Sequence, residues 1–245
     1  MANPTAAMLV IGDEILSGRT QDTNTGFLAG KLTGIGVALR EVRVVGDEQQ
    51  DIVDAVNALR HRYTYVFTSG GIGPTHDDIT ADAIAAAFGV PIDVREDARA
   101  ILATNYRNPG LELNEARLRM ARIPDGASLI DNPVSKAPGF RIGNVHVMAG
   151  VPAVFHVMVE SILPTLTGGQ PVQSVTVRFD MPEGAFAGQL AEIAKRNPDL
   201  SYGSYPYVRD GVFGSNVVVR GTDKARLEQA RLELEAIAAG PAPSG

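Results

Sequence analysis

Short apolar runs alternate with amphipathic segments over the first two thirds of the chain. The runs are continuous or rich in β-branched residues, which is typical of strands buried on both faces of a sheet. These predicted strands are residues 6–12, 37–45, 64–69 and 146–150. The segments with apolar residues at helical spacing are residues 24–32, 49–60, 78–88 and 154–166. The alternation predicts an α/β fold, a mostly parallel sheet with helices on both faces.

The rest of the chain completes a plan of two domains. Residues 97–122 are predicted to be mostly helical, with a break at 108–110. The stretch 167–171, rich in glycine, is the best linker candidate, and the pattern restarts beyond it on a smaller scale. The strands predicted there are 172–179, 200–208 and 215–221, and the helices are 184–196 and 222–239. The predicted domains are a large one at 1–168, a small α+β one at 172–240 and a disordered tail at 241–245.

Candidate chemistry follows three of the predicted strands. Ligands of open parallel sheets bind beyond the carboxyl ends of the strands, so the residues at these ends matter most. Gly12-Asp13-Glu14 follows the first strand, Gly46-Asp47 the second, and a glycine-rich loop at 69–73 the third. If the strands are parallel, all three groups lie at one edge of the sheet.

The glycine-rich loop has the composition of an anion site. Glycines 70, 71 and 73 allow close backbone approach and positive φ, so successive N–H groups can face a phosphate. Ser69 and Thr75 add hydroxyl donors, and the helix that follows adds its positive end. The loop is neither a Walker loop nor the dinucleotide fingerprint. By composition alone, a simple glycine turn and a phosphate cradle (Ser69, Gly70, Gly71, Gly73, Thr75) both remain open.

Asp77 and Asp78 follow this loop and have two readings. One could be a helix N-cap and the other a first-turn acid. As a site, two acids beside an anion loop without lysine need a cation, and Mg²⁺ commonly joins carboxylates to phosphate. Glu14, Asp22 and Asp47 could complete such a site, although Asp22 and Asp47 could also be N-caps.

Two further features near the predicted site have alternative readings. His76 is interpreted as a surface turn residue, with a general acid or base role as the alternative. The segment 132–139, rich in glycine and proline, could be an ordinary exposed loop, or it could bring Lys136 to a phosphate as a point charge.

Composition excludes several classes of function. The chain has 22 basic and 28 acidic residues, a net charge of −6, which argues against nucleic acid as a partner. It has no cysteine, so disulfides, thiolate metal sites and cysteine nucleophiles are excluded. The N-terminus lacks the features of a signal peptide or membrane span, and we expect a cytoplasmic protein without membrane partners.

The apolar helices suggest a homo-oligomer. Tyr202, Tyr205 and Tyr207 alternate along a predicted strand, which places them on one face or at an edge. We expect them in core or subunit-interface packing rather than in base stacking, given the acidic charge.

Five stretches together resemble the molybdopterin-binding-like domain of the competence/damage-inducible protein A (CinA) family. They read GDEILSGRTQDTN (12–24), VGDEQQDI (45–52), TSGGIGPTHDDIT (68–80), NPVSKAPGF (132–140) and AGVPAVF (149–155). The C-terminal part is similar to the middle domain of the same family. The resemblance implies a three-layer molybdopterin-binding-like fold, with a nucleotide or pterin phosphate bound by the loops. With Gly12, Asn132 and the Lys136 already considered, the candidate phosphate-binding residues extend beyond the glycine-rich loop.

The sequence departs from the family pattern in three places. Full-length members carry a further C-terminal amidohydrolase domain, and this chain stops before it. Ser135-Lys136 stands where Gly-Thr is common, and Val154 stands where the family commonly has a glutamate. These changes affect which ligand and which activity can be carried over.

The resemblance, together with these departures from it, leaves three candidate functions. CinA-type members imply metal-dependent cleavage of a pyrophosphate, with ADP-ribose as the typical substrate, and FAD synthase relatives imply hydrolysis of FAD. Here Asp77 and Asp78 would be catalytic, and Glu14, Asp47 and Asp78 would hold Mg²⁺ or Co²⁺, with no organic cofactor required. The alternatives are a molybdopterin-binding protein of molybdenum cofactor metabolism and a non-catalytic nucleotide-binding module. In each case the expected oligomer is a dimer.

Overall fold

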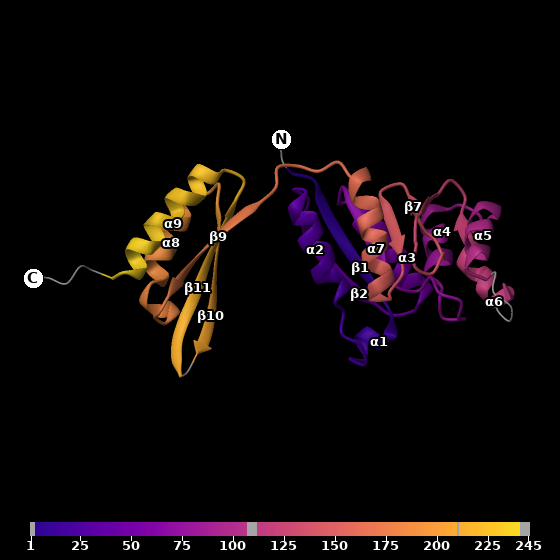
Figure 1. Cartoon of the computed structure of the whole chain (residues 1–245), viewed down its shortest axis with the longest axis horizontal. Coiled ribbons are helices and arrows are strands. Elements are labelled where there is room, and N and C mark those ends of the chain that lie inside the picture. The colour runs from indigo at the N-terminus through magenta and orange to yellow at the C-terminus, as the bar shows by residue number, and fades with distance from the viewer. Residues whose placement is uncertain (1–2, 107–111, 210, 241–245) are drawn as a thin grey trace, which may run out of the picture. The chain divides into compact units, whose positions relative to one another are not determined.

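The structure is a computed structural model that describes residues 3–106, 112–209 and 211–240. It divides into two units, the first ending at Gly169 and the second beginning at Gln170, within the predicted linker (Figure 1). The predicted helix break at 108–110 and the predicted tail at 241–245 lie outside the described residues.

A six-stranded sheet organises the first unit, in the order β2-β1-β3-β8-β7-β6. Strands β2, β1, β3 and β8 are parallel, and β7 and β6 continue the sheet in antiparallel pairs. The strands are β1 (Thr5–Ile11), β2 (Ala38–Val45), β3 (Tyr65–Ser69), β6 (Ser128–Ile130), β7 (Gly139–Ile142) and β8 (Val145–Met148). The four predicted strands and the mostly parallel sheet are confirmed, and β6 and β7 are strands that the pattern did not predict.

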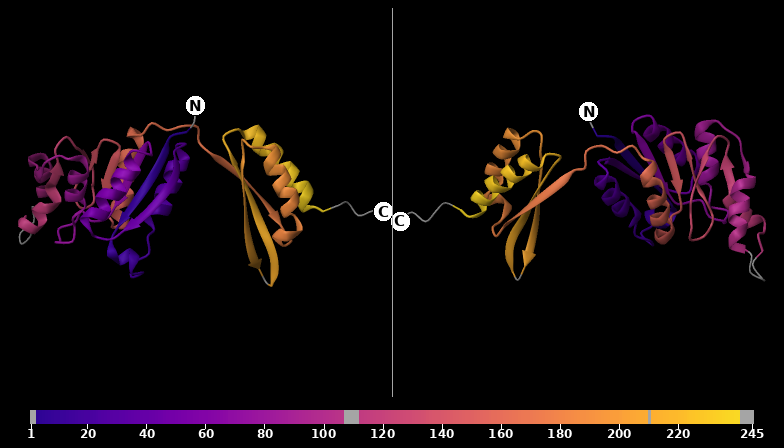
Figure 2. Two further views of the ribbon diagram at one scale, coloured as in Figure 1. Left: turned by 180° about the vertical axis from the view of Figure 1, so that it is seen from behind. Right: turned by 45° about the horizontal axis from the view of Figure 1, so that its top comes forward.

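Helices cover both faces of this sheet (Figures 1 and 2). The helices are α1 (Asp13–Leu16), α2 (Asn24–Gly34), α3 (Gln49–Arg60), α4 (Thr80–Phe88), α5 (Glu96–Ala103), α6 (Glu115–Leu118) and α7 (Pro152–Ile162). Helix α4 begins at Thr80 rather than Asp78, which leaves both aspartates in the loop before it. The segment predicted as mostly helical contains α5 and α6 and is flanked by two short paired strands, β4 (Ile92–Val94) and β5 (Arg122–Pro124).

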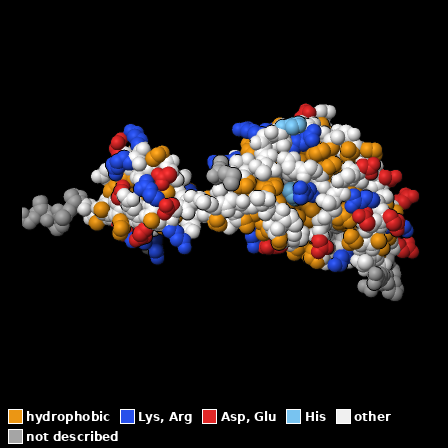
Figure 3. Space-filling view, turned by 90° about the horizontal axis from the view of Figure 1, so that it is seen from above, with side chains coloured by type: hydrophobic (Ala, Val, Ile, Leu, Met, Phe, Trp, Pro, Cys, Tyr) orange, Lys and Arg blue, Asp and Glu red, His pale blue; other side chains and the backbone are white. Residues whose placement is uncertain are grey.

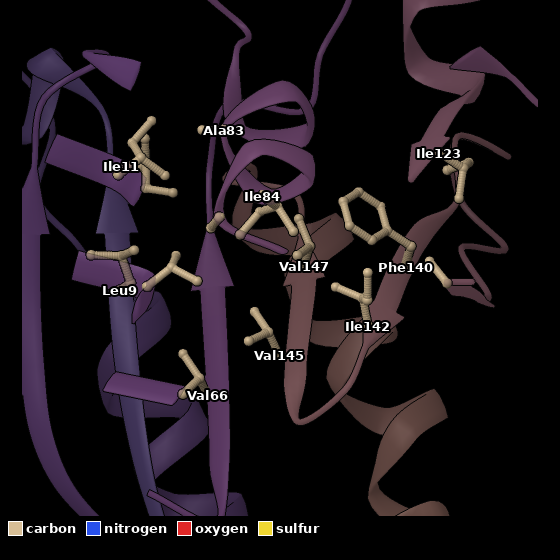
Figure 4. Close-up of a cluster of buried hydrophobic side chains, with 14 of the residues drawn as sticks. Leu9, Ile11, Val66, Ala83, Ile84, Ile123, Phe140, Ile142, Val145 and Val147 are labelled. Carbon is tan, nitrogen blue, oxygen red and sulfur yellow. The ribbon is translucent and has the colours of Figure 1, made fainter. Parts of the chain in front are cut away.

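Strand β1 is buried on both faces, and its side chains alternate between two cores. Leu9 and Ile11 pack with residues of α3 and α4, such as Ile84 (Figure 4). Met8 and Val10 pack on the other face with residues of α2 and α7. Each fully buried aliphatic side chain of this kind stabilises the fold by about 1.5–3 kcal/mol. The continuous apolar run is therefore explained by a central strand between two helical layers.

The register of the parallel strands aligns their carboxyl ends. Ile11 lies opposite Val45, and Ser69 lies opposite Met148 on its other neighbour. Val10, one residue before the end of β1, lies opposite Ser69. The loops that follow these strands therefore leave the sheet at the same edge, as the sequence predicts.

The second unit is a three-stranded antiparallel sheet with two helices. The strand order is β10-β11-β9, from β9 (Gln173–Phe179), β10 (Ser201–Arg209) and β11 (Val212–Gly221), with α8 (Ala187–Arg196) and α9 (Lys224–Ala238). The predicted small α+β domain has this composition. Tyr202 packs against its core, whereas Tyr205 is exposed, because a spacing of three places them on opposite faces of β10. The three tyrosines therefore do not share one face, and the alternative of an edge position is confirmed, because β10 is an edge strand of this sheet.

Two observations concern the expected absence of membrane and nucleic-acid partners. Within residues 3–106, 112–209 and 211–240, no helix is long and apolar enough to cross a membrane. Side chains of Lys and Arg occur together with those of Asp and Glu on the face of each unit shown in Figure 3. The expected absence of nucleic acid as a partner stays a prediction.

Candidate functional site

A cleft of about 540 Å³ lies at the carboxyl edge of the parallel strands. Its walls come from four loops, those after β1, β2, β3 and β8, and from the segment 132–137. Nine predicted site residues line it: Gly12, Glu14, Asp47, Gly70, Gly71, Gly73, Asp77, Asp78 and Asn132. Its volume is in the range of sites for small organic ligands.

Gly70 and Gly71 have backbone conformations that only glycine adopts easily. Their φ angles are +114° and +67°, and a Cβ at either position would collide with a neighbour. At Gly70 the neighbour is the carbonyl oxygen of Ile11, and at Gly71 it is the hydroxyl of Thr80. The Thr80 hydroxyl also donates to the Gly70 carbonyl at 3.0 Å, and the Thr80 N–H donates to the Gly71 carbonyl at 3.0 Å. The loop is thus held against β1 and against the first residue of α4.

Two of the predicted metal-binding carboxylates are held directly over glycines. The Glu14 carboxylate lies where a Cβ on Gly12 would be, and Asp78 Oδ2 would be 2.6 Å from a Cβ on Gly73. Asp78 Oδ2 accepts hydrogen bonds from the N–H and the hydroxyl of Thr75, at 2.8 and 2.5 Å. These contacts fix the Asp78 carboxylate at the wall of the cleft.

The third carboxylate, Asp47, is bound to the loop after β1. Its Oδ2 accepts from the Asp13 N–H at 3.0 Å, and its own N–H donates to Asp13 Oδ1 at 3.4 Å. Burial raises the pKa of Asp47, and the negative charges of Asp13, Glu14 and Asp77 raise it further, against the lowering effect of the Asp13 N–H. Burial is therefore the main cause of the raised pKa of Asp47, and the neighbouring acids add to it.

Asp77 has a different environment. The nearby Thr75 side chain is the main cause that lowers the pKa of the exposed Asp77 carboxyl, followed by the Asp77 N–H, although the Thr75 hydroxyl hydrogen itself is donated to Asp78. The side chain of His76 next to it is almost fully exposed, as expected for a surface turn. Among the described residues that line the cleft, there is no Lys, Arg or His. Four carboxylates and a glycine loop thus line the cleft, and none of its described lining residues has a basic side chain.

This donor set fits a divalent ion only if a ligand supplies part of the coordination shell. Among the described residues, no group of three or more His, Cys, Asp or Glu side chains is close enough to hold a metal ion. Glu14, Asp47 and Asp78 line one cleft but do not form a closed protein site. Mg²⁺ is usually bound by one or two carboxylates together with substrate phosphates and water, and the cleft offers such carboxylates.

The observed helix termini contradict the interpretation of the aspartates as N-caps. The N-cap of α4 is Ile79 and that of α3 is Glu48, so neither Asp47, Asp77 nor Asp78 caps a helix. Asp22, in contrast, accepts from the N–H of Asn24 at 2.9 Å at the start of α2. The N-cap of α2 is Thr23, so Asp22 is not the N-cap either, although its carboxylate binds the first N–H of the helix; the helix termini do not explain the other three acids.

Three predicted phosphate-binding residues do not line the main cleft. Thr75 directs its hydroxyl to Asp78, and Ser69 accepts a hydrogen bond from Asn24 Nδ2 at 2.8 Å while 3% exposed. Lys136 has a φ of 59° and donates its N–H to the Asn132 carbonyl at 3.1 Å. These three residues are therefore not part of the wall of the main cleft, and contact of their side chains with a phosphate stays a prediction.

Asn132 lines the cleft, but its side chain is engaged within its own loop. Its Nδ2 donates to Ser135 Oγ at 2.6 Å and to the Ala137 carbonyl at 2.8 Å. Its Oδ1 accepts from the N–H groups of Val134 and Ser135, both at 3.2 Å. Asn132 therefore shapes the loop wall rather than offering free donors to a ligand.

Asn24 and Arg119 support the loops of the site from outside the main cleft, and the sequence interpretation assigned neither of them this role. Asn24, 4% exposed, donates to Ser69 Oγ and to the Gly150 carbonyl, both at 2.8 Å, and so joins the ends of β3 and β8 to α2. Arg119 donates to the Asp78 carbonyl at 3.3 Å from outside the cleft. The sequence signal that could have identified Asn24 is its position after Asp22 at the start of a helix. Arg119 lies in a segment that was predicted only to be helical.

Comparison with known proteins follows the same division of the chain. Residues 7–168 match the family described as "Probable molybdopterin binding domain", and residues 171–240 match "FAD synthase, middle domain". A protein from Pyrobaculum arsenaticum is 38% identical over 82% of this chain and 79% of its own length. A probable FAD synthase from Caenorhabditis briggsae is 31% identical over 96% of this chain, and the chain spans about half of that protein's length.

A solved structure supports the fold of the first unit. The crystal structure of the protein CinA with unknown function from Thermoplasma acidophilum is 33% identical in sequence, with a TM-score of 0.62. The match covers 67% of this chain and 99% of that one. The first unit holds the glycine loop and the four cleft carboxylates. The chain therefore belongs to the molybdopterin-binding domain family, in the form related to CinA and to the FAD synthases.

Proposed function

We propose that the chain is a metal-dependent pyrophosphatase that cleaves ADP-ribose or a related dinucleotide such as FAD. One observation carries the proposal: four carboxylates and a glycine loop line a cleft that has no basic side chain among its described lining residues. A pyrophosphate held there is repelled by the acids unless a divalent cation lies between them. The relationship to the FAD synthases supports a dinucleotide as the ligand.

The residues of the cleft have separate roles in this proposal. The backbone N–H groups of residues 71–73 bind phosphate oxygens, since the positive φ of Gly71 turns successive amides toward one side. Glu14, Asp47 and Asp78 hold Mg²⁺ or Co²⁺, which when bound neutralises the developing negative charge on the phosphoryl oxygens. Thr75 fixes the orientation of the Asp78 carboxylate through two hydrogen bonds.

The bond that breaks is the phosphoanhydride. The oxygen of a water molecule forms a new bond to one phosphorus atom, and the bridging oxygen leaves with the other phosphate, so ADP-ribose gives AMP and ribose 5-phosphate. Asp77, which is exposed at the cleft, orients this water. Asp77, which holds no metal ion in this proposal, accepts the water proton.

The test is release of AMP from ADP-ribose or FAD, measured with Mg²⁺ or Co²⁺. The Asp78→Asn variant should lose turnover by a factor of about 100 or more, since a metal ligand is lost while the shape is kept. Asp223→Asn is the matched control, because Asp223 caps α9 in the second unit and asparagine caps equally well. Absence of turnover with any divalent ion would sink the proposal.

A molybdopterin-binding protein is the second candidate, favoured by the family match and by the apolar side of the cleft. Ile72, Met120, Val151 and Val154 line it beside the glycine loop and can contact a ring. In this case isothermal titration shows binding of a pterin phosphate without cleavage of any pyrophosphate. Tight ADP-ribose binding with an unchanged ligand would instead identify a non-catalytic nucleotide-binding module.

A further inference from the structure

The segment 74–78, which carries Asp77 and Asp78, is held mainly by contacts within itself. It belongs to the loop between β3 and α4, and residues 74–77 are exposed. The Asp78 N–H donates to the Thr75 carbonyl at 3.2 Å, and the Asp78 carboxylate accepts from the N–H and the hydroxyl of Thr75. These three bonds are local, so they fix the shape of the segment but not its position at the cleft.

Among the residues that the structure describes, one hydrogen bond joins the segment 74–78 to a distant part of the chain. Arg119 Nη2 donates to the Asp78 carbonyl oxygen at 3.3 Å, across 41 positions of sequence. Arg119 begins the short 3₁₀-helix Arg119–Ala121, and the residue after it, Met120, lines the main cleft. The guanidinium therefore attaches the acidic segment to another part of the cleft wall.

Arg119 lies behind the wall of the cleft rather than in the cleft. A small cavity of about 10 Å³ lies on this side, and Gly71, Gly73 and Asp78 line both the small cavity and the main cleft. Arg119 lines only the small cavity, which has room for no more than about one water molecule. The side chain is thus packed against the back of the wall that carries the glycine loop and Asp78, and it can act on a ligand only through that wall.

A second arginine, Arg122, lines the same small cavity and has a different set of partners. Its Nη1 donates to Asp82 Oδ2 at 2.7 Å, so each of these two charges neutralises the other. Arg119 has no carboxylate partner among the described residues, and its buried Nε has no hydrogen-bond partner there either. Burial of a charged group without such partners is unfavourable for folding. Stability alone therefore explains Arg122 but does not explain an arginine at position 119.

We propose that Arg119 is a positioning residue, which holds the main chain of Asp78 so that the carboxylates of Asp77 and Asp78 keep their places at the cleft. The inference rests on the proposed function, because it takes Asp78 as a ligand of the divalent ion. Contacts that support a metal ligand from behind orient it, and their loss typically lowers metal affinity or activity by about 10–100-fold. Arg119 contacts the main chain rather than the carboxylate, so the expected effect is at the lower end of this range.

The experiment compares Arg119→Met with the matched control Arg122→Met in two measurements. One is the Mg²⁺ concentration that gives half-maximal release of AMP from ADP-ribose, and the other is the melting temperature without metal. Arg119→Met loses the bond to Asp78 but keeps a long side chain, so it should need about tenfold more Mg²⁺, while its melting temperature is unchanged or higher. Arg122→Met leaves Asp82 without its partner, so its melting temperature should fall while its Mg²⁺ dependence is unchanged.

A conservative variant and a binding measurement complete the test. Arg119→Lys keeps the positive charge and an N–H donor but lacks the planar guanidinium, so its Mg²⁺ requirement should return to within about threefold of that of the unmodified chain. Isothermal titration of ADP at a series of fixed Mg²⁺ concentrations gives the same comparison without turnover. In this titration the Mg²⁺ concentration needed for ADP binding should rise in Arg119→Met and not in Arg122→Met.

The outcomes separate the inference from the proposed function. An unchanged Mg²⁺ dependence in a folded Arg119→Met, with the unmodified chain active, refutes the inference and leaves the proposed function standing. Equal shifts in both methionine variants, or a shift that Arg119→Lys does not reduce, show a merely structural role and also overturn it. If the unmodified chain releases no AMP, the proposed function fails and the titration decides: Mg²⁺-dependent ADP binding that Arg119→Met weakens supports the positioning role, and absence of such binding refutes both.

Discussion

The acids of the cleft in the first unit and the surface acids of the second unit lie in opposite environments. In the second unit Asp199 pairs with Arg226 at 3.1 Å and Asp180 with Arg178 at 2.7 Å, and the arginines lower the pKa of both carboxyls. In the first unit the cleft gathers four carboxylates with no basic side chain in its described lining, and burial and like charges raise the pKa of Asp47.

The acids of the second unit are neutralised at the surface, whereas the acids of the cleft remain available to a ligand. Exposed ion pairs contribute about 0–1 kcal/mol each, whereas clustered acids destabilise the free protein until a cation binds. Perturbed carboxyls in a cleft are a feature of functional sites. The contrast between the units therefore supports a ligand site in the first unit without reference to any relative.

The largest expected effect contrasts two glycines with positive φ, Gly70 in the first unit and Gly211 in the second. Gly70→Ala should destabilise the first unit by about 3–5 kcal/mol, because its Cβ would collide with the Ile11 backbone in addition to the left-handed strain. Gly211→Ala should cost about 1–2 kcal/mol, since no atom of the described residues lies within 4 Å of its Cβ position. Urea unfolding of both variants measures the pair, and equal losses would contradict the packing of the loop after β3.

Acid stability should depend on His146, which is buried in the first unit. Neither ring nitrogen has a hydrogen-bond partner among the described residues, and burial lowers the pKa of His146 to about 4 from an ordinary 6.5. The unfolded chain takes up a proton below pH 6.5 and the folded chain does not until about pH 4, so stability falls through this window by about 3 kcal/mol.

The check is thermal unfolding between pH 7 and pH 4 for the unmodified chain and for His146→Leu. The variant should lose this part of the pH dependence and be at least as stable at pH 7, because two buried nitrogens are removed from the core. His61 is exposed at the end of α3, with Nδ1 2.7 Å from the Asn57 carbonyl oxygen, and His61→Leu is the control variant. A pH profile that is unchanged in His146→Leu would show that other groups govern acid unfolding.

The sequence predicted those features that depend on long local patterns. Strands β1, β2, β3 and β8 were found because each is an apolar or β-branched run, and the shared edge followed from parallel connection. Strands β6 and β7 were missed because they have only three and four residues, on either side of a connection that contains two prolines. Short strands of this kind are fixed by pairing with their neighbours rather than by their own composition.

The candidate site was predictable in position but not in its individual contacts. Glu14, Asp47 and Asp78 were expected together because each follows a parallel strand, and they line one cleft. The role of Asn24 depends on Ser69 and Gly150, which are 45 and 126 positions away, so no local pattern contains it. Whether the carboxylates bind a metal ion stays a prediction.

The smallest expected effect tests the opening contrast most directly. Asp47→Asn should raise the free energy of unfolding of the metal-free protein by a few tenths to about 1 kcal/mol, because it removes a charge that Asp13, Glu14 and Asp77 oppose. The amide oxygen introduced by this substitution can still accept from the Asp13 N–H. The stabilising effect should grow as pH rises through the raised pKa of Asp47, since only the ionised carboxylate is unfavourable.

Asp199→Asn in the second unit should have the opposite sign, a small loss of stability, because it removes a charge that Arg226 stabilises. Thermal unfolding of both variants measures the contrast. Added Mg²⁺ should reverse the ranking for Asp47 alone, raising the melting temperature of the unmodified chain more than that of Asp47→Asn. Destabilisation by both substitutions without metal would mean that the cleft acids are paired as fully as the surface acids. In that case the negative charge of the cleft would no longer support a bound cation.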